Sequence, residues 1–396
     1  MNALDQIFVS TLHRLAGFAP ASARPLVSML LIIAGLMALF GTCFALATIL
    51  ERKTLGRMQN RYGPNRVGPF GLFQPIADGV KMLIKEDIVP FSADQALHFL
   101  APLVLTVPVW LAFAVLPFGR NMSAIELDSG ILFFFAIGSA SELAVFMAGW
   151  SSQNKYSLLG AMRAIAQMIS YEVPLVLASV PALIAAGSLS LPAIVQAQSG
   201  FALGWVPRWN VFTPWGLAGF ALFLIAATAE SNRCPFDLPE GESELIAGYL
   251  TEYSGFKYAL FFLGEYLGLF AVTGLAVTLF LGGWQAPAPW LQWLPTWGWF
   301  ALKFSALIFL FIWARATLPR LRLDQLLHFA WKFLVPLALI NLVVAVAWCK
   351  SGLWQFPAAL EIRWLLGAGV LAASYVGLGR SWKGGYPERR QYNYAQ

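Results

Sequence analysis

The acidic residues of this sequence are concentrated in one stretch that begins and ends beside apolar segments. Of the chain's twenty Asp and Glu residues, seven lie between positions 230 and 265: Glu230, Asp237, Glu240, Glu242, Glu244, Glu252 and Glu265. An ionisable side chain costs roughly 2.5 to 3.5 kcal/mol at the centre of a membrane helix. Carboxylates that approach apolar segments from both sides therefore indicate a site.

This acidic stretch, residues 230–265, also has a simpler interpretation, because a run of charges in a loop is usually a solvated surface. Apolar residues between the acids argue for burial instead: Phe236, Leu238, Leu245, Ile246, Tyr249 and Tyr253. Neighbouring buried carboxylates cannot all stay ionised, so some of them are expected to hold protons near neutral pH.

Carboxylates are also expected inside the apolar segments themselves. Glu142, Glu172 and Glu265 lie within predicted spans, and Glu230 closes another. At 1.5 Å per helical residue, Glu142 and Glu265 stand roughly 12 to 14 Å from the cytoplasmic ends of their helices. All four belong to the cytoplasmic half of the membrane, whereas Lys303 reaches from the other half. Proton or cation movement is the default interpretation of such a series.

The elements that position these groups follow from composition. Hydrophobic residues make up 59% of the chain and charged residues only 12%, which exceeds the apolar content of an ordinary soluble domain. We predict an all-α polytopic membrane protein whose residues 1–396 form a single integral membrane domain. The net charge of +6 is explained by basic loops at one membrane surface and does not indicate nucleic-acid binding.

The sequence shows no metal, disulfide or nucleotide-binding motif. Its cysteines and histidines are far apart: Cys43, Cys234, Cys349, His13, His98 and His328. Any metal or redox centre is therefore expected on another chain, and energy has to come from a partner chain, a gradient or a diffusible substrate. The sequence also shows no internal repeat of the kind found in transporters, which argues against a free-standing ion antiporter.

Nine apolar stretches meet or approach the length of about twenty residues that crosses the hydrocarbon. They lie at about 25–50, 98–118, 131–150, 166–187, 214–232, 257–282, 297–315, 333–349 and 364–379. The apolar run within residues 1–24 is too short for the core of a signal peptide. If the loop after the first span is cytoplasmic, nineteen of the 26 Lys and Arg residues lie on that side. This asymmetry predicts an outer N-terminus and a cytoplasmic tail.

The first cytoplasmic loop, residues 51–97, is expected to be ordered. From residue 72 onward, apolar residues recur at helical spacing with charges opposite them, which predicts an amphipathic helix on the membrane surface. The apolar positions are Leu72, Phe73, Ile76, Val80, Leu83 and Ile84. Glycines and prolines before this helix enforce turns, with arginines between them. Contact with anionic lipid would explain these arginines without any further function.

Arginines also mark the fourth cytoplasmic loop. Arg322 and Lys332 are explained as anchors that reach the membrane surface. Arg315 lies closer to the apolar segment and needs a partner, which the acidic stretch could supply.

Five stretches resemble the membrane protein known as the H subunit of bacterial respiratory complex I, whose mitochondrial counterpart is NADH dehydrogenase subunit 1. They read ERKTLGRMQNRYGPNRVGPFGLFQPIADGVKMLIKE, NKYSLLGAMRAIAQMISYE, AESNRCPFDLPEGESELIAGYLTEYSG, LFFLGEY and RATLPRLRLDQLLHFAWK. Together they cover all four cytoplasmic loops in the order of that family.

This resemblance implies a membrane subunit of a proton-pumping NADH:quinone oxidoreductase. Quinone, the substrate, would enter from the bilayer into a chamber shared with the peripheral arm. NADH, FMN and iron–sulfur clusters would be held by partner subunits, and this chain would bind no redox centre and no metal. Its partners would be the peripheral subunits of the quinone site, neighbouring membrane-arm subunits and lipids, in the inner membrane of a bacterium.

The resemblance also assigns residues by their place in the matching motifs. Five belong to the quinone chamber: Arg52, Arg61, Phe236, Arg315 and Arg320. Eight acids belong to a relay that links quinone reduction to proton movement: Glu51, Glu172, Glu230, Asp237, Glu240, Glu242, Glu244 and Glu265. Quinone reduction takes up two protons in a cavity of low dielectric, so nearby carboxylates should respond to it.

Two features depart from the family pattern. Glu142 lies outside these motifs and is either an extra member of the relay or a locally paired carboxylate. Residues 350–396 extend past the last expected helix and predict an extra span with a basic, aromatic tail, which would anchor in lipid or contact a neighbouring subunit.

The main alternative function is the related membrane subunit of an energy-converting hydrogenase. The complete arginine and glycine pattern of the first loop favours a quinone chamber instead. A purely structural anchor for soluble partners would leave the intramembrane acids without a purpose.

Overall fold

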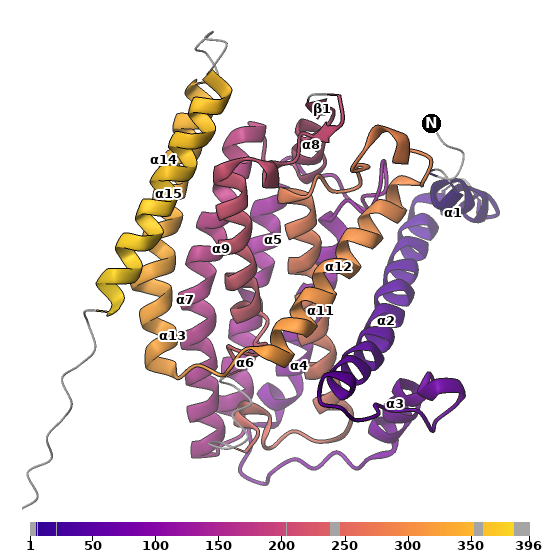
Figure 1. The fold of residues 1–396 in the computed structure, drawn as a ribbon. Helices are drawn as coiled ribbons and strands as arrows, with labels where there is room; N and C mark the ends of the chain where they lie inside the picture. Colours follow the sequence, from indigo (N-terminus) through magenta and orange to yellow (C-terminus); the bar gives the residue numbers. More distant parts are fainter. Residues whose placement is uncertain are drawn as a thin grey trace, which may run out of the picture.

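Helices make up almost all of the regular structure (Figure 1). The computed structural model describes residues 5, 7–20, 22–202, 204–237, 246–351 and 359–383. Within these ranges, eight helices are long and apolar enough to cross a membrane, and the shorter helix α9 (Pro214–Glu230) is also apolar. The prediction of an all-α polytopic membrane protein is confirmed.

The first half of the chain forms α1 (Ile7–Gly17), α2 (Arg24–Met58), α3 (Gln74–Ile84), α4 (Gln95–Val115), α5 (Gly130–Gly138), α6 (Ala140–Ser151), α7 (Lys155–Ala186) and α8 (Leu191–Ala197). The second half adds α9, α11 (Gly255–Phe280), α12 (Thr296–Thr317), α13 (Leu323–Phe329), α14 (Val335–Ser351) and α15 (Ala359–Lys383). Short 3₁₀ turns lie at Pro69–Gly71, Asn210–Phe212, Gly248–Leu250 and Pro289–Leu291. A π-helical turn, Ala330–Leu334, joins α13 to α14, and β1 (Phe201–Ala202) pairs antiparallel with β2 (Val206–Pro207).

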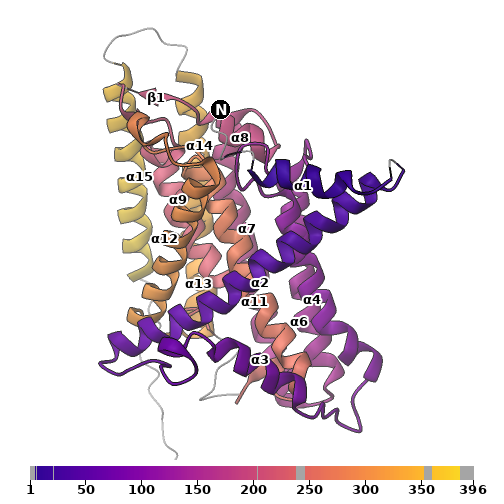
Figure 2. The same ribbon diagram turned by 90° about the vertical axis from the view of Figure 1, so that its right-hand side faces the viewer.

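The bundle is built around α11, which is buried along most of its length. Helix α7 packs against α6, α9 and α14, and α4 packs against α6 and α11. Helix α2 crosses the bundle obliquely (Figure 2). At one end of the bundle, here the α3 end, α3 lies across the tips of the spans, whereas α1, α8 and β1 lie at the opposite α1 end.

Two helices extend well beyond the apolar runs that predict them. Helix α2 continues to Met58, so Glu51 and Arg52 stand on a helix and not in a loop. Helix α7 begins at Lys155, where the Asn154 side chain accepts a hydrogen bond from the Tyr156 amide at 3.0 Å. The length of an apolar run in the sequence indicates only the part of a helix that crosses the hydrocarbon. The ends of the helix are set by capping residues and turns.

The amphipathic helix predicted in the first loop is present as α3. Its apolar residues are exposed on the isolated chain, as expected for a helix that rests on lipid: Ile76, Val80, Leu83 and Ile84. The turn before it depends on Gly71, which has a φ of 75°. A Cβ atom there would lie 2.3 Å from the Pro64 carbonyl oxygen, so only glycine, which has no Cβ atom, fits at this position.

The C-terminal extension contributes α15, which packs against α14 and α9. The Tyr375 ring lies 5.5 Å from that of Phe333, and the Trp364 indole donates a hydrogen bond to the Phe212 carbonyl at 3.3 Å. The opposite side of α15 is exposed, with Leu365 71% accessible. Helix α15 therefore forms one edge of the bundle (Figure 1).

Candidate functional site

Glu51 of α2 is the centre of a buried ion cluster near the α3 end. Glu51 is 5% exposed, and its carboxylate accepts hydrogen bonds from Arg233 at 3.2 and 3.3 Å. The Tyr266 hydroxyl of α11 donates to the same carboxylate at 2.6 Å, and Arg315 of α12 donates to it as well. A buried carboxylate is stable only when such donors replace water. Glu51 therefore joins three segments that are far apart in the sequence.

Arg233 lies between two carboxylates. Its Nε is 3.8 Å from an oxygen of Glu265, and its guanidinium carbon is 3.9 Å from the centre of the Tyr266 ring. Burial alone would lower the pKa of Arg233, but the neighbouring Glu265 and Glu51 carboxylates raise it above its ordinary value. The residue is therefore a permanent buried cation.

The turn that follows α9 is also tied to the segment after α12. Arg320 donates a hydrogen bond to the Asp237 carbonyl and lies 4.0 Å from the Asp237 carboxylate. The Leu321 amide donates to the Pro235 carbonyl at 3.2 Å. Phe236 is buried, with its ring 5.2 Å from that of Tyr171 in α7. The predicted residues Phe236, Asp237 and Arg320 are thus brought close to the ion cluster.

A small cavity adjoins this cluster. Its lining is mostly polar and comes from the turn after α9 and from α11 and α12: Asn232, Arg233, Cys234, Asp237, Phe262, Glu265 and Arg315. We call this space the chamber. Its two arginines can receive an electronegative group, such as a carbonyl oxygen, from a bound molecule.

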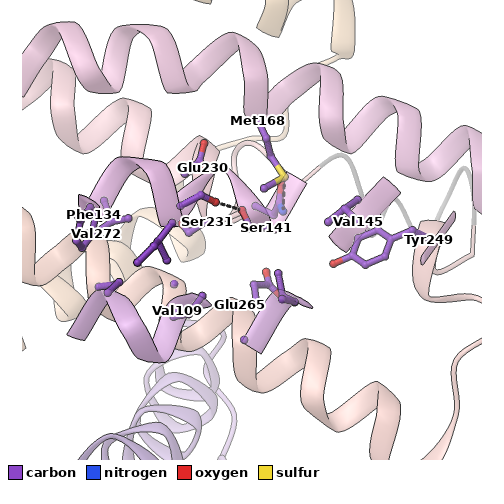
Figure 3. Close-up of a pocket in the computed structure, with 18 residues that line it drawn as sticks. Val109, Phe134, Ser141, Val145, Met168, Glu230, Ser231, Tyr249, Glu265 and Val272 are labelled. Carbon is purple, nitrogen blue, oxygen red and sulfur yellow. Dashed lines mark hydrogen bonds between the residues drawn. The ribbon is translucent and has the colours of Figure 1, made fainter. Parts of the chain in front are cut away.

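A larger cavity lies deeper, between α4, α5, α6, α7, α9 and α11. Its walls are mainly apolar, including Val109, Phe134 and Val272, and Glu230 and Glu265 reach it from different helices (Figure 3). Glu265 and Asn232 line both this inner cavity and the chamber. A single carboxylate is therefore shared by the two spaces.

Two further carboxylates interact electrostatically with Glu230. Glu142 of α6 and Glu172 of α7 lie close enough to act electrostatically on each other, and both act on Glu230. One oxygen of Glu142 and one of Glu230 are buried with no hydrogen-bond partner among the described residues. We call these three acids, which come from three helices, the inner carboxylates.

Arg52 and Arg61, the remaining predicted chamber residues, are both exposed. Arg52 forms an ion pair of 2.6 Å with Asp78, which also accepts a hydrogen bond from Gln74 at 3.0 Å. Partial burial alone would raise the pKa of Asp78, but the hydrogen bonds from Arg52 and Gln74 lower it overall. Arg61 donates to the Gln59 side chain at 2.8 Å.

Three predicted relay acids, Glu240, Glu242 and Glu244, lie outside the described residues. In contrast, sequence reasoning missed Arg233 and Tyr266. In the sequence Arg233 resembles any other loop charge, and its partners Glu51 and Glu265 are far from it along the chain. Tyr266 follows Glu265 directly, but its contact with Glu51 cannot be inferred from one sequence.

Comparison with known proteins gives one consistent family. Residues 31–346 match the NADH dehydrogenase family. The H subunit of NADH-quinone oxidoreductase from Dehalococcoides mccartyi is 52% identical over 312 residues, covering 78% of this chain and 84% of the relative. The H subunit from Geobacillus kaustophilus is 50% identical over 304 residues, covering 76% of this chain and 88% of the relative. The H subunit from Polaromonas naphthalenivorans is 41% identical over 361 residues, covering 89% of this chain and 100% of the relative.

The family match includes the ion cluster, both cavities and the inner carboxylates, whereas α15 lies beyond it. It spans well over half of the chain, and the relatives align along most of their own length. The chain belongs to the NADH dehydrogenase family, together with the proteins named as the H subunit of NADH-quinone oxidoreductase.

Proposed function

We propose that this chain is the membrane subunit of a proton-pumping NADH:quinone oxidoreductase, and that it forms a quinone chamber together with the peripheral arm. Quinone reaches the chamber from the bilayer, and electrons come from NADH through FMN and iron–sulfur clusters on partner subunits. Support comes from the family match and from the polar chamber close to the α3 end. In this arrangement, the α3 end faces the bacterial cytoplasm and the N-terminus faces outward, as the Lys and Arg distribution predicts.

The observation that carries the proposal is that Glu265 lines both the chamber and the inner cavity. On the chamber side it lies 3.8 Å from Arg233, which also contacts Glu51. On the inner side it shares a cavity with Glu230, which interacts with the other inner carboxylates. A change of charge in the chamber can therefore reach the inner acids through one side chain.

The chemistry suits this arrangement. Reduction of a quinone to a quinol consumes two electrons and two protons and forms two O–H bonds. Charge develops on the quinone oxygens before the protons arrive, and the cations Arg233 and Arg315 stabilise it in a site of low dielectric. The electrostatic attraction between these arginines and the carboxylates of Glu51 and Glu265 then weakens, which favours proton uptake by those acids. The inner carboxylates pass the perturbation along the membrane arm.

The remaining assignments follow the resemblance. The larger quinone space formed with the peripheral arm is bordered by Arg52, Arg61, Phe236 and Arg320, which lie outside the lining of the chamber itself. Asp237, which lines the chamber, begins the relay. Glu240, Glu242 and Glu244 continue it from the segment that precedes the 3₁₀ turn Gly248–Leu250. Glu142 is an additional relay member, because it lies close enough to Glu172 to act on it electrostatically.

The test is to purify the tagged chain in mild detergent from its native membrane and to assay NADH-dependent quinone reduction in the recovered complex. We expect peripheral subunits with FMN and iron–sulfur clusters to co-purify with inhibitor-sensitive activity. The Arg315→Ala complex should assemble and transfer electrons to an artificial acceptor, but its quinone turnover should fall by about tenfold or more, since a buried carboxylate loses a charged donor. Recovery of the chain with a hydrogenase module, or normal quinone kinetics in this variant, would refute the proposal.

A further inference from the structure

Gln167 of α7 is a fully buried amide that the proposed function does not use. Its Nε2 donates to the carbonyl oxygens of Ala229 at 2.7 Å and Phe236 at 2.6 Å, and it lies 3.2 Å from the Asn232 side-chain oxygen. Two carbonyl acceptors fix the orientation of the amide, because only its nitrogen can donate to them. The Gln167 side chain therefore joins the two ends of the turn formed by residues 229–236.

That turn carries the buried cation. Beyond Glu230, where α9 ends, it is neither helix nor strand. Local backbone hydrogen bonds in it include Arg233 N to Thr228 O at 3.1 Å and Phe236 N to Arg233 O at 2.8 Å. Asn232 has a φ of 50°, a conformation that most residues rarely adopt. Such a turn keeps one geometry only if side chains from a rigid element hold its carbonyl groups.

Helix α7 supplies that rigid element. Tyr171, four residues after Gln167 and hence on the same face, packs its ring on Phe236 and donates a hydrogen bond to the Leu326 carbonyl at 3.1 Å. Glu172, one residue further, is one of the inner carboxylates. One helix therefore holds the turn of Arg233 on one face and an inner carboxylate on another.

We infer that Gln167 is a positioning residue, which fixes the 229–236 turn to α7 and thereby keeps Arg233 between Glu51 and Glu265. The inference rests on the proposed function, because it assigns the position of a chamber cation. Gln167 lines neither the chamber nor the inner cavity, so its role is exerted through the turn. Its Oε1 has no hydrogen-bond partner in the described part of the chain, so the two N–H groups carry the effect.

The first experiment measures the turn without relying on activity. Cys234 lies in the turn and is partly exposed in the chamber, so its rate of maleimide labelling reports on opening of the turn. The intact complex is used in a Cys43→Ser, Cys349→Ser background. Gln167→Met keeps the length of the side chain but removes both donors, whereas Gln167→Glu retains at most one hydrogen. We expect labelling to accelerate on the order of tenfold in Gln167→Met and less in Gln167→Glu.

The matched control is Gln198→Met. Gln198 is also a buried amide that joins separate segments, and its Nε2 donates to the Thr278 carbonyl at 2.9 Å. It lies next to α8 at the α1 end, far from the chamber. This variant should lower stability to a similar extent but leave the labelling of Cys234 unchanged.

The second experiment separates positioning from general destabilisation. In Gln167→Met, the apparent KM for a short-chain quinone should rise about fivefold or more while electron transfer to an artificial acceptor is retained; Gln198→Met should keep the wild-type KM. Equal Cys234 labelling in the Gln167 and Gln198 variants would overturn the inference, even if the wild-type complex reduces quinone. If the wild-type complex reduces no quinone, the proposed function fails, whereas the labelling result still decides the role of Gln167. If Gln167→Met does not assemble, Gln167→Glu gives the same comparison.

Discussion

Glu51 shows how a single carboxylate can organise a site. It accepts from Arg233, Tyr266 and Arg315, which come from the turn after α9, from α11 and from α12. Each contact replaces water lost on burial, and loss of one partner would leave another charge unpaired. The same property makes the cluster sensitive to a new charge in the chamber, so its stability and its proposed function have the same physical origin.

Asp78 offers a test of the link between α2 and α3. Because its pKa lies below the ordinary value of 3.8, its stabilising effect is present above that value and is lost only as the pH falls through the lower pKa of the folded state. The ion pair with Arg52 is therefore intact throughout the neutral range. Asp78→Asn should raise the apparent quinone KM roughly two- to fivefold, by the same factor at pH 6 and pH 8.

The comparison for Asp78→Asn is Glu126→Gln, which removes an exposed acid at the α1 end and should leave the KM unchanged. A KM effect that disappears between pH 8 and pH 6 would mean that Asp78 takes up a proton in this range, contrary to its depressed pKa.

A candidate site residue could be predicted from the sequence where a charged side chain lies at the boundary of an apolar run. Arg315 stands at the boundary of an apolar run, where an ionisable group needs a partner. Glu51 was assigned only from the resemblance of its motif. Their shared contact could not be predicted, because it depends on how α2 and α12 pack. Arg233 was missed for the same reason: in sequence it is one more loop cation, and only its 6% exposure shows that it is buried.

At the scale of elements, α11 joins the chamber to the inner cavity. Gly268 lines the inner cavity one turn beyond Glu265, and a Cβ atom there would meet nothing within 4 Å. Gly268→Leu should therefore fill the cavity with little strain and exclude water from the carboxylates. We expect quinone reduction to continue at a reduced rate, with at least about a twofold fall in protons translocated per quinol formed.

Proton translocation by Gly268→Leu is measured in reconstituted vesicles, against Gly35→Leu on α2. Gly35 also has open space at its Cβ position but lines neither cavity. Equal proton yields in the two variants would show that the inner cavity takes no part in proton movement.

The helices themselves could be predicted because twenty apolar residues in a row have few alternatives in a membrane. Their ends could not, since α2 and α7 continue beyond the hydrocarbon as far as Met58 and back to Lys155. The amphipathic helix α3 was recognised by its apolar spacing, and its turn by Gly68 and Gly71, both of which have positive φ. The break between α5 and α6 had no sequence signal that we recognised.

At the scale of the whole molecule, the site is enclosed by helices of the family core, and α15 is an addition at the edge. Residues 31–346 match the family, and α15 contacts α14 and α9 on the side away from α2 and α12. Ending the chain after residue 351 should therefore retain at least about half of the quinone turnover. Its thermal midpoint should fall by several degrees, because apolar surface on α14 and α9 is uncovered.

The comparison for this truncation is a chain that ends after residue 383, which keeps α15 and removes only the final segment. It should match the full chain in both turnover and thermal midpoint. Complete loss of quinone turnover in an assembled complex that lacks α15 would show that the extension is part of the site.

The central claim is that Glu265 connects quinone chemistry in the chamber to the inner carboxylates. The most direct measurement is the number of protons translocated per quinone reduced by the Glu265→Gln complex in sealed vesicles. Glu252→Gln is the matched control, because Glu252 is held by Asn154 at 2.6 Å and lines neither cavity. We predict that the proton yield falls well below the wild-type value in Glu265→Gln and stays at that value in Glu252→Gln. An unchanged proton yield in Glu265→Gln would contradict the account.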